Sequence, residues 1–302
     1  MEIRASTLTP EQYLARRGGI SGSDTPVILG LNTFRSPIDV YLDKLETGPQ
    51  PEEDVTDAML FGSLLEDVNI ALYEQRENRK VRRNNRTQTH PKHSWLKANI
   101  DGKIVGEHRG YEGKNVGYMM AGDWGPAYTA EVPGYVIGQV HHYMLVMGWP
   151  KYDVSAVVGG HEQRVYYLER DKEFEEMIID QTHDFWHNHV LAKIPPEPNW
   201  AAAAVVNERA FKRLWQRVNT DVITLDPEAV EWTEEYLKQR QIRLDAEKAE
   251  KTAKVHVQGM LGEAGTGTLP DGTGWIRKEV SKKEYTVKAS SNIQTSFSKK
   301  PL

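Results

Sequence analysis

The stretch NIDGKIVGEHRGYEGKN, residues 99–115, decides the fold class because it predicts two short neighbouring strands that carry three charged side chains. A strand alternates its faces with period two, so Glu112 and Lys114 point the same way and Gly113 points the other way. Asp101 ends the preceding predicted strand, and no other Glu-x-Lys occurs in the chain. Two carboxylates and one ammonium group are therefore expected together on a small sheet.

The spacing Asp, about ten residues, Glu-x-Lys is typical of sites that hydrolyse phosphodiesters with Mg²⁺. Carboxylate oxygens suit this hard cation, and cleavage needs charge neutralised at the attacking and leaving oxygens. A surface hairpin with a cross-strand salt bridge would show the same spacing, and this alternative stays open. Asp101-Gly102-Lys103 is a competing Asp-x-Lys, which we interpret as an Asp-Gly turn.

The rest of the chain predicts helices and strands around this stretch. The expected helices cover residues 37–46, 57–74, 133–147, 172–192 and 227–254. A meander of three strands is expected within residues 79–116, and two strands at 153–158 and 163–169 joined by Gly159-Gly160. Ser21 or Ser23 is expected to cap a short helix, and the tail from residue 255, with TGWIRKEV and KEYTVKAS, suggests a small sheet.

Several polar residues outside the central stretch are candidates for the same site. Glu66 lies on its predicted helix about 100° from the apolar stripe, which suits a carboxylate looking into a cleft. Gln139 interrupts an apolar helix and needs a polar partner, because an unpaired buried amide costs about 1–3 kcal/mol. Arg16, Ser21 and Ser23 precede a helix and could receive a terminal phosphate. The local alternatives are a solvent-facing glutamate, an amide bonded to backbone and plain helix capping. The apolar stripe consists of Phe61, Leu64, Leu65, Val68 and Leu72.

Charge is distributed unevenly along the chain. The 302 residues contain 38 Lys and Arg against 43 Asp and Glu, a net charge of −5, so the whole protein has no basic signature for nucleic acid. Residues 76–114 nevertheless concentrate ten Lys and Arg before Lys114 against four acids. This basic stripe suits a phosphate backbone, although such a run also occurs on an ordinary solvated face.

Composition excludes other classes of site. The chain has no cysteine, which removes disulfides, thiolate catalysis and Cys-ligated zinc. No apolar run reaches the roughly 18 residues of a membrane span, and the first residues lack the apolar stretch of a signal peptide. A cytoplasmic protein without membrane contact is expected.

Four segments together resemble the YqaJ-type viral recombinase family, a lambda exonuclease-like group with the PD-(D/E)xK nuclease fold. The resemblance covers about residues 14–195. The segments, in the order of the family, are GGISGSDTPVILGLNTFRSPIDVYLDKLETG, FGSLLEDVNIALYE, NIDGKI followed by GYEGKN, and VPGYVIGQVHHYMLVMGW.

The resemblance implies an α+β fold with a restriction-endonuclease-like core, in which helices flank a mixed central sheet. It implies an exonuclease domain over residues 1–198 and a C-terminal accessory region over 199–302, with a long helix and a small β element. Residues 199–302 themselves match nothing in the family. The implied activity is Mg²⁺-dependent digestion of double-stranded DNA ends, 5′-to-3′, in phage-type recombination.

Roles follow residue by residue from the same resemblance. Asp101 resembles the carboxylate that bridges two Mg²⁺ ions, for which Mn²⁺ may substitute, and Lys114 resembles the lysine that orients the attacking water. Glu66 and Glu112 resemble the other ligands. The family often has a bulkier residue at Gly113, whose carbonyl would complete the shell. Gln139 resembles a glutamine close to the metals, Arg16 and Ser23 resemble the pair that receives the 5′-phosphate, and Ser21 is counted with them.

The family implies a homo-oligomer, perhaps a trimer, and a single-strand annealing partner. Two alternatives stay open: an endonuclease on the same fold, and a catalytically silent module that binds DNA or directs assembly.

Overall fold

The structure is a computed structural model that describes residues 17–46, 57–84, 86–218, 220–281 and 295–296. The chain divides into two compact units, residues 1–216 and 217–302. No helix within the described ranges is long and apolar enough to cross a bilayer.

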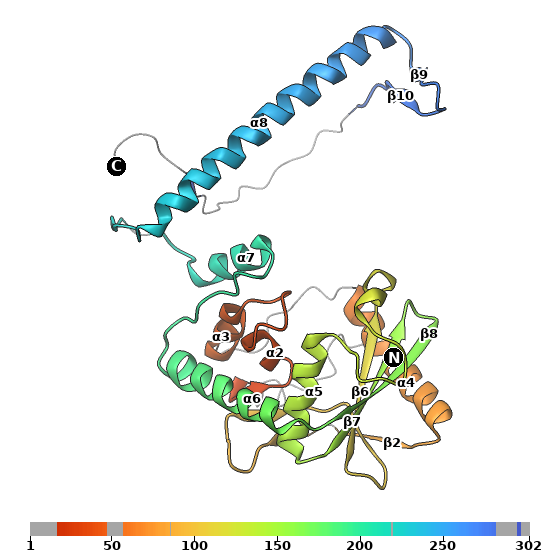
Figure 1. The fold of residues 1–302 in the computed structure, drawn as a ribbon, viewed down its shortest axis with the longest axis vertical. Coiled ribbons are helices and arrows are strands. Elements are labelled where there is room, and N and C mark those ends of the chain that lie inside the picture. Colours follow the sequence, from red (N-terminus) through yellow and green to blue (C-terminus); the bar gives the residue numbers. More distant parts are fainter. Residues whose placement is uncertain (1–16, 47–56, 85, 219, 282–294, 297–302) are drawn as a thin grey trace. The chain divides into compact units, whose positions relative to one another are not determined.

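The first unit is built on a five-stranded mixed sheet of order β2-β5-β6-β7-β8 (Figure 1). Strands β6 and β7 run parallel, and the other neighbours are antiparallel. A smaller sheet has the order β1-β4-β3. The strands are β1 (Ile20–Ser21), β2 (Val81–Arg83), β3 (Gln88–Thr89), β4 (Leu96–Ala98), β5 (Gly102–Ile104), β6 (Arg109–Val116), β7 (Lys151–Val158) and β8 (Glu162–Glu169).

Helices lie on both faces of the large sheet, as Figure 1 shows for α4 and α5. The helical segments of this unit are α2 (Thr25–Ile28), α3 (Pro37–Leu45), α4 (Asp57–Glu77), the 3₁₀ segment η1 (Tyr118–Asp123), α5 (Gly134–Met147), α6 (Lys172–Asp184), the π-helical segment η2 (Phe185–Leu191) and α7 (Ala204–Leu214). The expected mixed sheet flanked by helices is confirmed.

The main core lies between α5 and one face of the sheet. Val140 and Met144 of α5 pack with Tyr152, Val154 and Ala156 of β7, and all five are fully buried. The other face packs against α4 through Tyr73 and Tyr111, whose rings meet edge to face at 4.9 Å. Strand β7 is therefore buried from Tyr152 to Val158, although Asp153 and Ser155 within it are polar.

The local signals at the helix ends are mostly borne out. Ser36 caps α3 in a capping box with Asp39, and Pro37 is the first helical residue. Gly148, at φ 67°, ends α5 in the left-handed conformation that glycine adopts without strain. The prediction that Ser21 or Ser23 caps α2 is wrong, because Asp24 holds that position and Ser21 bonds to its carboxylate.

The region of the predicted meander differs from expectation. It contains five strands instead of three, divided between the two sheets. Asp101-Gly102 is not a hairpin turn, because Gly102 already pairs with Tyr111 as the first residue of β5. The reversal comes later, around Gly106 at φ 84°. A strand this short pairs because its neighbours hold it, which local turn signals do not reveal.

Helix α4 forms as predicted, but its buried face is not the predicted one. Leu64, Val68 and Leu72 are each between 41% and 49% exposed, while Asn69 and Tyr73 are buried against the sheet. The side chain of Phe61 lies outside the described residues. The buried face of α4 is chosen by hydrogen bonds to the sheet and not by the apolar stripe.

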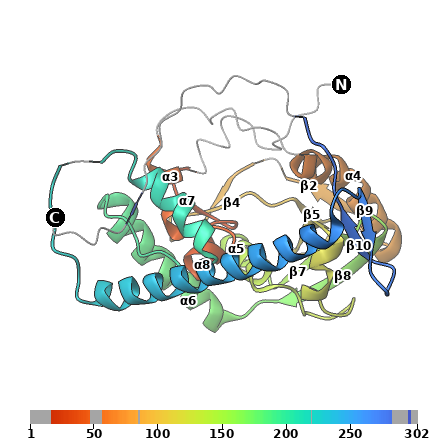
Figure 2. The same cartoon turned by 90° about the horizontal axis from the view of Figure 1, so that it is seen from above.

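Helix α7 belongs to the first unit, because it packs on α3 (Figures 1 and 2). The two compact units divide after residue 216; the expected exonuclease domain over residues 1–198 and accessory region over 199–302 stay a prediction. The second unit contains α8 (Glu228–Leu261), which has no buried residue, and the hairpin of β9 (Thr266–Thr268) and β10 (Gly274–Ile276). The segment KEYTVKAS lies outside the described residues.

Candidate active site

Three side chains form a tight polar cluster on the α5 face of the large sheet. The Lys114 ammonium donates to Glu112 Oε1 at 2.7 Å and to Gln139 Oε1 at 2.8 Å. The Gln139 amide nitrogen donates to the same Glu112 oxygen at 2.8 Å. The strand period and the α5 helix thus bring together three of the predicted residues. The Glu112 side chain is 3% exposed and that of Lys114 is 21% exposed, so the lysine is the more accessible member of this ion pair.

Asp101 lies beside this cluster because of the register of β5 on β6. Gly102 pairs with Tyr111, which places Asp101 next to Glu112. The Gly113 amide donates to Asp101 Oδ2 at 2.9 Å and fixes the carboxylate. Gly113 therefore contributes its N–H to the site, while the predicted role of its carbonyl as a metal ligand stays a prediction.

The carboxylates are held in an unfavourable electrostatic position. Burial, together with the negative charge of Asp101, raises the pKa of Glu112 to about 7, although the Lys114 charge opposes the rise. Burial also raises the pKa of Asp101. Burial alone would lower the pKa of Lys114, but Glu112 raises it, so the amine stays an ammonium. Perturbed pKa values of this kind cluster where a site is arranged for function.

Glu66 approaches the same carboxylates from α4. Burial and the charge of Asp101 raise its pKa, and Arg83 opposes the rise from 3.5 Å. Glu112 in turn feels the Glu66 charge. Glu66, Asn69 and Tyr73 follow each other at helical spacing on the face of α4 that packs on the sheet. The three predicted acids are therefore electrostatic neighbours.

The fit of a divalent cation can be judged at Glu112. Its Oε2 is buried and has no hydrogen-bond partner, which is costly for a carboxylate oxygen and would be relieved by a hard cation. Among the described residues, no group of three His, Asp or Glu side chains is already arranged around one point as a metal site. Asp101 and Glu112 are the pair whose chemistry fits, with Glu66 as a further carboxylate.

The predicted phosphate-receiving segment is organised by a residue that the sequence did not single out. Asp24, 4% exposed, accepts from the Ser21 amide at 2.9 Å and from the Ser21 hydroxyl at 2.6 Å. Lys44 neutralises Asp24 at 2.6 Å. The Ser21 and Ser23 hydroxyl oxygens lie 3.3 Å apart. Because the Ser21 proton goes to Asp24, Ser23 is the donor in the pair of serine hydroxyls. Arg16 lies outside the described residues.

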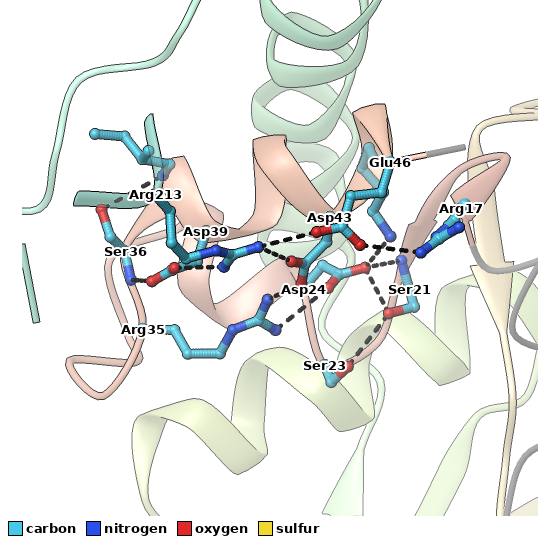
Figure 3. Close-up of polar contacts among 12 residues, drawn as sticks. Arg17, Ser21, Ser23, Asp24, Arg35, Ser36, Asp39, Asp43, Glu46 and Arg213 are labelled. Carbon is cyan, nitrogen blue, oxygen red and sulfur yellow. Dashed lines mark hydrogen bonds and ion pairs between the residues drawn. The ribbon is translucent and has the colours of Figure 1, made fainter. Parts of the chain in front are cut away.

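A network of charges continues from this segment to α7 (Figure 3). Arg213 binds Asp39 and Asp43, each at 2.7 Å, and Arg35 binds the other oxygen of Asp43. Arg17 reaches Glu46 at 3.0 Å. Ion pairs therefore hold helix α7 against helix α3, which carries Asp39 and Asp43.

The serine segment also touches the polar cluster through α5. A Cβ on Gly22 would lie 2.3 Å from the ring of Tyr143, so only glycine allows this approach. The Tyr143 hydroxyl accepts from the Gln139 amide at 3.0 Å. The two predicted parts of the site, for the phosphate end and for hydrolysis, are therefore in contact through one tyrosine.

Comparison with known proteins identifies the family. The YqaJ-like viral recombinase domain matches residues 12–150. A protein of Bacillus subtilis (strain 168), the uncharacterized protein YqaJ, is 36% identical over 231 residues, covering 75% of this chain and 70% of its own. The chain belongs to the YqaJ-like viral recombinase family.

The chain is also similar to solved structures. An alkaline exonuclease, LHK-Exo, from Laribacter hongkongensis is 19% identical, with a TM-score of 0.48 over 68% of this chain and 100% of its own. Its complex with dAMP gives a TM-score of 0.49 over 62% of this chain and 94% of that one. A phage related exonuclease from Haemophilus somnus 129PT gives 0.35 at 12% identity, over 43% of this chain and 70% of that one.

In this YqaJ-like protein the predicted basic stripe is largely used internally. Arg79 and Arg109 both bind the fully buried Asp153, at 3.2 and 2.6 Å, and Arg109 also binds Glu107. Arg83 binds Asp67 at 2.6 Å as well as Glu66. These arginines hold strands and α4 together, so the count of basic residues overstates the charge available to a ligand.

The sequence reasoning missed Asn69, which joins α4 to the sheet behind the polar cluster. Its amide nitrogen donates to the Ser155 carbonyl at 2.8 Å, and its oxygen accepts from the Ser155 hydroxyl at 2.6 Å. Gln163 donates to the same serine hydroxyl at 2.9 Å. A Cβ on Gly113 would lie 3.3 Å from the Asn69 nitrogen. The sequence signal was the combination of Asn69, a polar residue inside an apolar helix, with Gly113, a glycine inside a strand.

Proposed function

We propose that this protein is a divalent-cation-dependent exonuclease that digests the ends of double-stranded DNA in the 5′-to-3′ direction, in phage-type recombination. The observation that carries the proposal is the buried Glu112 carboxylate, bonded on one oxygen to Lys114 and left without a partner on the other. Membership in the viral recombinase family supports DNA as the substrate.

In the proposed reaction, Asp101 and Glu112 hold one Mg²⁺, and Glu66 with Asp101 holds a second. Mg²⁺ would supply charge neutralisation at the scissile phosphate and a lower pKa for the attacking water. Mn²⁺ is expected to substitute, because it also accepts carboxylate ligands.

The side chains of this protein would do the rest. Lys114 donates two of its three protons to Glu112 and Gln139, which leaves the third for a water or a phosphate oxygen. Gln139 fixes the rotamer of the lysine, and Tyr143 fixes Gln139. Ser23 and Arg16 are proposed to receive the 5′-phosphate, with Ser21 and Asp24 holding Ser23 in place.

A time course on linear duplex tests the proposal. Duplexes labelled at either the 5′ or the 3′ end are incubated with Mg²⁺, with Mn²⁺ or with EDTA, beside a covalently closed circle. We expect stepwise loss from the 5′ end, dependence on the cation and an intact circle. Lys114→Ala should abolish hydrolysis and leave DNA binding.

Each alternative function gives a different pattern. Rapid cleavage of the circle would replace the proposal by an endonuclease. DNA binding without cation-dependent hydrolysis would replace it by a silent binding module. Arg16→Ala should slow digestion of 5′-phosphorylated ends more than of 5′-hydroxyl ends, and equal slowing would reject the phosphate role.

We further infer from the family resemblance that the protein acts as a homo-oligomer, a trimer, and delivers the remaining strand to a single-strand annealing protein. The molar mass by light scattering tests the first part. Co-purification with an annealing protein encoded beside this one tests the second.

A further inference from the structure

Two aromatic side chains on the surface of the first unit lie close to the polar cluster and have no role in it. Phe34, 57% exposed, is in the loop between α2 and α3, and Tyr135 is in the first turn of α5. Their rings meet edge to face, with centroids 6.3 Å apart and an interplanar angle of 78°. An exposed aromatic ring in this arrangement leaves a face open to another planar group.

The position of Tyr135 is set by the helix that carries Gln139. Residues four apart lie on the same side of an α-helix, so Tyr135 is one turn before Gln139, whose oxygen binds the Lys114 ammonium at 2.8 Å. The Tyr135 hydroxyl and Lys114 also interact electrostatically. The aromatic pair is therefore adjacent to the group proposed to meet the scissile phosphate.

The loop that carries Phe34 is held firmly against α5. Gly134 and Gly138 form a small-residue surface on which Leu31 and Pro26 pack; a Cβ on Gly138 would lie 3.1 Å from the Pro26 Cβ. The Phe34 amide donates to Asn32 Oδ1 at 2.8 Å. Its carbonyl accepts from Arg209 of α7 at 3.2 Å. The exposed ring is thus pre-positioned, which reduces the entropy lost on binding.

We propose that Phe34 and Tyr135 form a subsite that stacks on a nucleobase of the strand being digested. This inference rests on the proposed function, because it takes the Lys114 site to hold a phosphodiester of that strand. The 5′-phosphate segment contacts Tyr143, one turn after Gln139, whereas Tyr135 lies one turn before Gln139, so the aromatic pair is placed for the base that follows the phosphodiester held at Lys114. Stacking accepts any base, which suits an enzyme that must digest every sequence.

The direct test is fluorescence of a duplex with 2-aminopurine as the second base from the 5′ end of the digested strand, measured in EDTA so that no strand is cut. We expect the full-length wild-type protein to quench the probe on binding. Phe34→Leu and Tyr135→Leu should remove most of the quenching, whereas Tyr135→Phe, which keeps the ring, should retain it. Tyr128→Leu is the matched control, because Tyr128 is 55% exposed and packs on Tyr167 of the edge strand β8.

A second test uses digestion. Removing the second base from the 5′ end to leave an abasic sugar should lower kcat/KM of the wild type about tenfold, within the range for one base stacked on an aromatic ring. Tyr135→Leu should digest both ends at the same lowered rate. Thermal unfolding of each variant shows that it is folded.

The outcomes distinguish a failure of the proposed function from a failure of the stacking subsite. A wild type that neither binds nor digests duplex ends contradicts the proposed function. A wild type that does both, but with quenching and base preference unchanged in the two leucine variants, contradicts the stacking subsite alone. Leucine variants that change the molar mass and not the quenching would show instead that Phe34 and Tyr135 lie between copies of the chain.

Discussion

The charge of Glu112 should destabilise the protein when no cation is bound, and this can be measured with Glu112→Gln. A carboxyl whose pKa is higher in the folded protein favours the folded state at low pH and loses this advantage as pH rises. For Glu112 the pKa moves from 4.5 to about 7. The wild type should therefore lose stability relative to Glu112→Gln between these values and stay constant above them.

The size of the effect follows from the two pKa values. A difference of about 2.5 pH units, at about 1.4 kcal/mol each, corresponds to roughly 3 kcal/mol over the full titration. Between pH 5 and pH 8, about 2 to 3 kcal/mol of this should appear. For a folded unit of this size, that is a change in Tm of several degrees.

The assay is thermal or urea unfolding of both proteins in EDTA at several pH values from 5 to 8. Burial lowers the pKa of His142 to about 4 and gives a pH dependence of opposite sign, but both proteins share it, so it cancels in the difference. Glu162→Gln is the control, because Arg164 lowers the pKa of that exposed glutamate. Mg²⁺ at pH 8 should stabilise the wild type and not Glu112→Gln.

Parallel pH profiles of the wild type and Glu112→Gln, with equal stabilisation by Mg²⁺, would refute the reasoning. They would show that the buried carboxylate carries no electrostatic penalty and holds no cation.

Four further substitutions test how the site is supported. Asn69→Ala should lower the free energy of unfolding by about 3 kcal/mol, because it removes the acceptor of the buried Ser155 hydroxyl proton and one of the acceptors of the Gln163 amide; urea unfolding measures this. Gly110→Ala should cost at least about 3 kcal/mol, since its Cβ would lie 2.0 Å from the fully buried ring of Tyr152, and a normal Tm would contradict the close approach. Arg213→Met should destabilise the protein by about 2 kcal/mol. The Arg209 side chain is 57% exposed and 3.7 Å from the Asp39 carboxylate, so Arg209→Met should cost less than about 0.5 kcal/mol. Equal Tm values of the two variants would show that ion pairs do not hold α7.

The arrangement of side chains on β6 was predictable because its information is local. The alternation of Glu112, Gly113 and Lys114 fixes which side chains share a face, whatever surrounds the strand. Gln139 was predictable for the same reason, since a lone amide on an apolar helix requires a polar partner, and Lys114 is that partner. Each of these two signals can be recognised within a few residues of sequence and does not depend on how the chain packs.

Contacts between distant segments were not predictable. Asp24 is buried because Lys44, twenty residues later, neutralises it. Asn69 faces the sheet because Ser155, 86 residues away, completes its hydrogen bonds, and this outweighs the burial of Leu64, Val68 and Leu72. A periodic pattern measures only apolar area, so it gives the wrong face when a buried polar network decides the orientation.

Strand β6 links the side chains on the two faces of the large sheet. On the α5 side, Glu112 and Lys114 form the polar cluster, and on the α4 side Gly113 leaves room for Asn69. The Asn69 amide also reaches the Lys114 carbonyl at 3.4 Å, so α4 contacts the backbone of the residue whose side chain lies on the other face. Because Glu66 is one turn before Asn69, the bonds that hold Asn69 also set how far Glu66 stands from Asp101 and Glu112. The glycine where the family often has a bulkier residue is therefore matched to the asparagine, and a larger side chain at residue 113 would move α4 and its carboxylate away from the site.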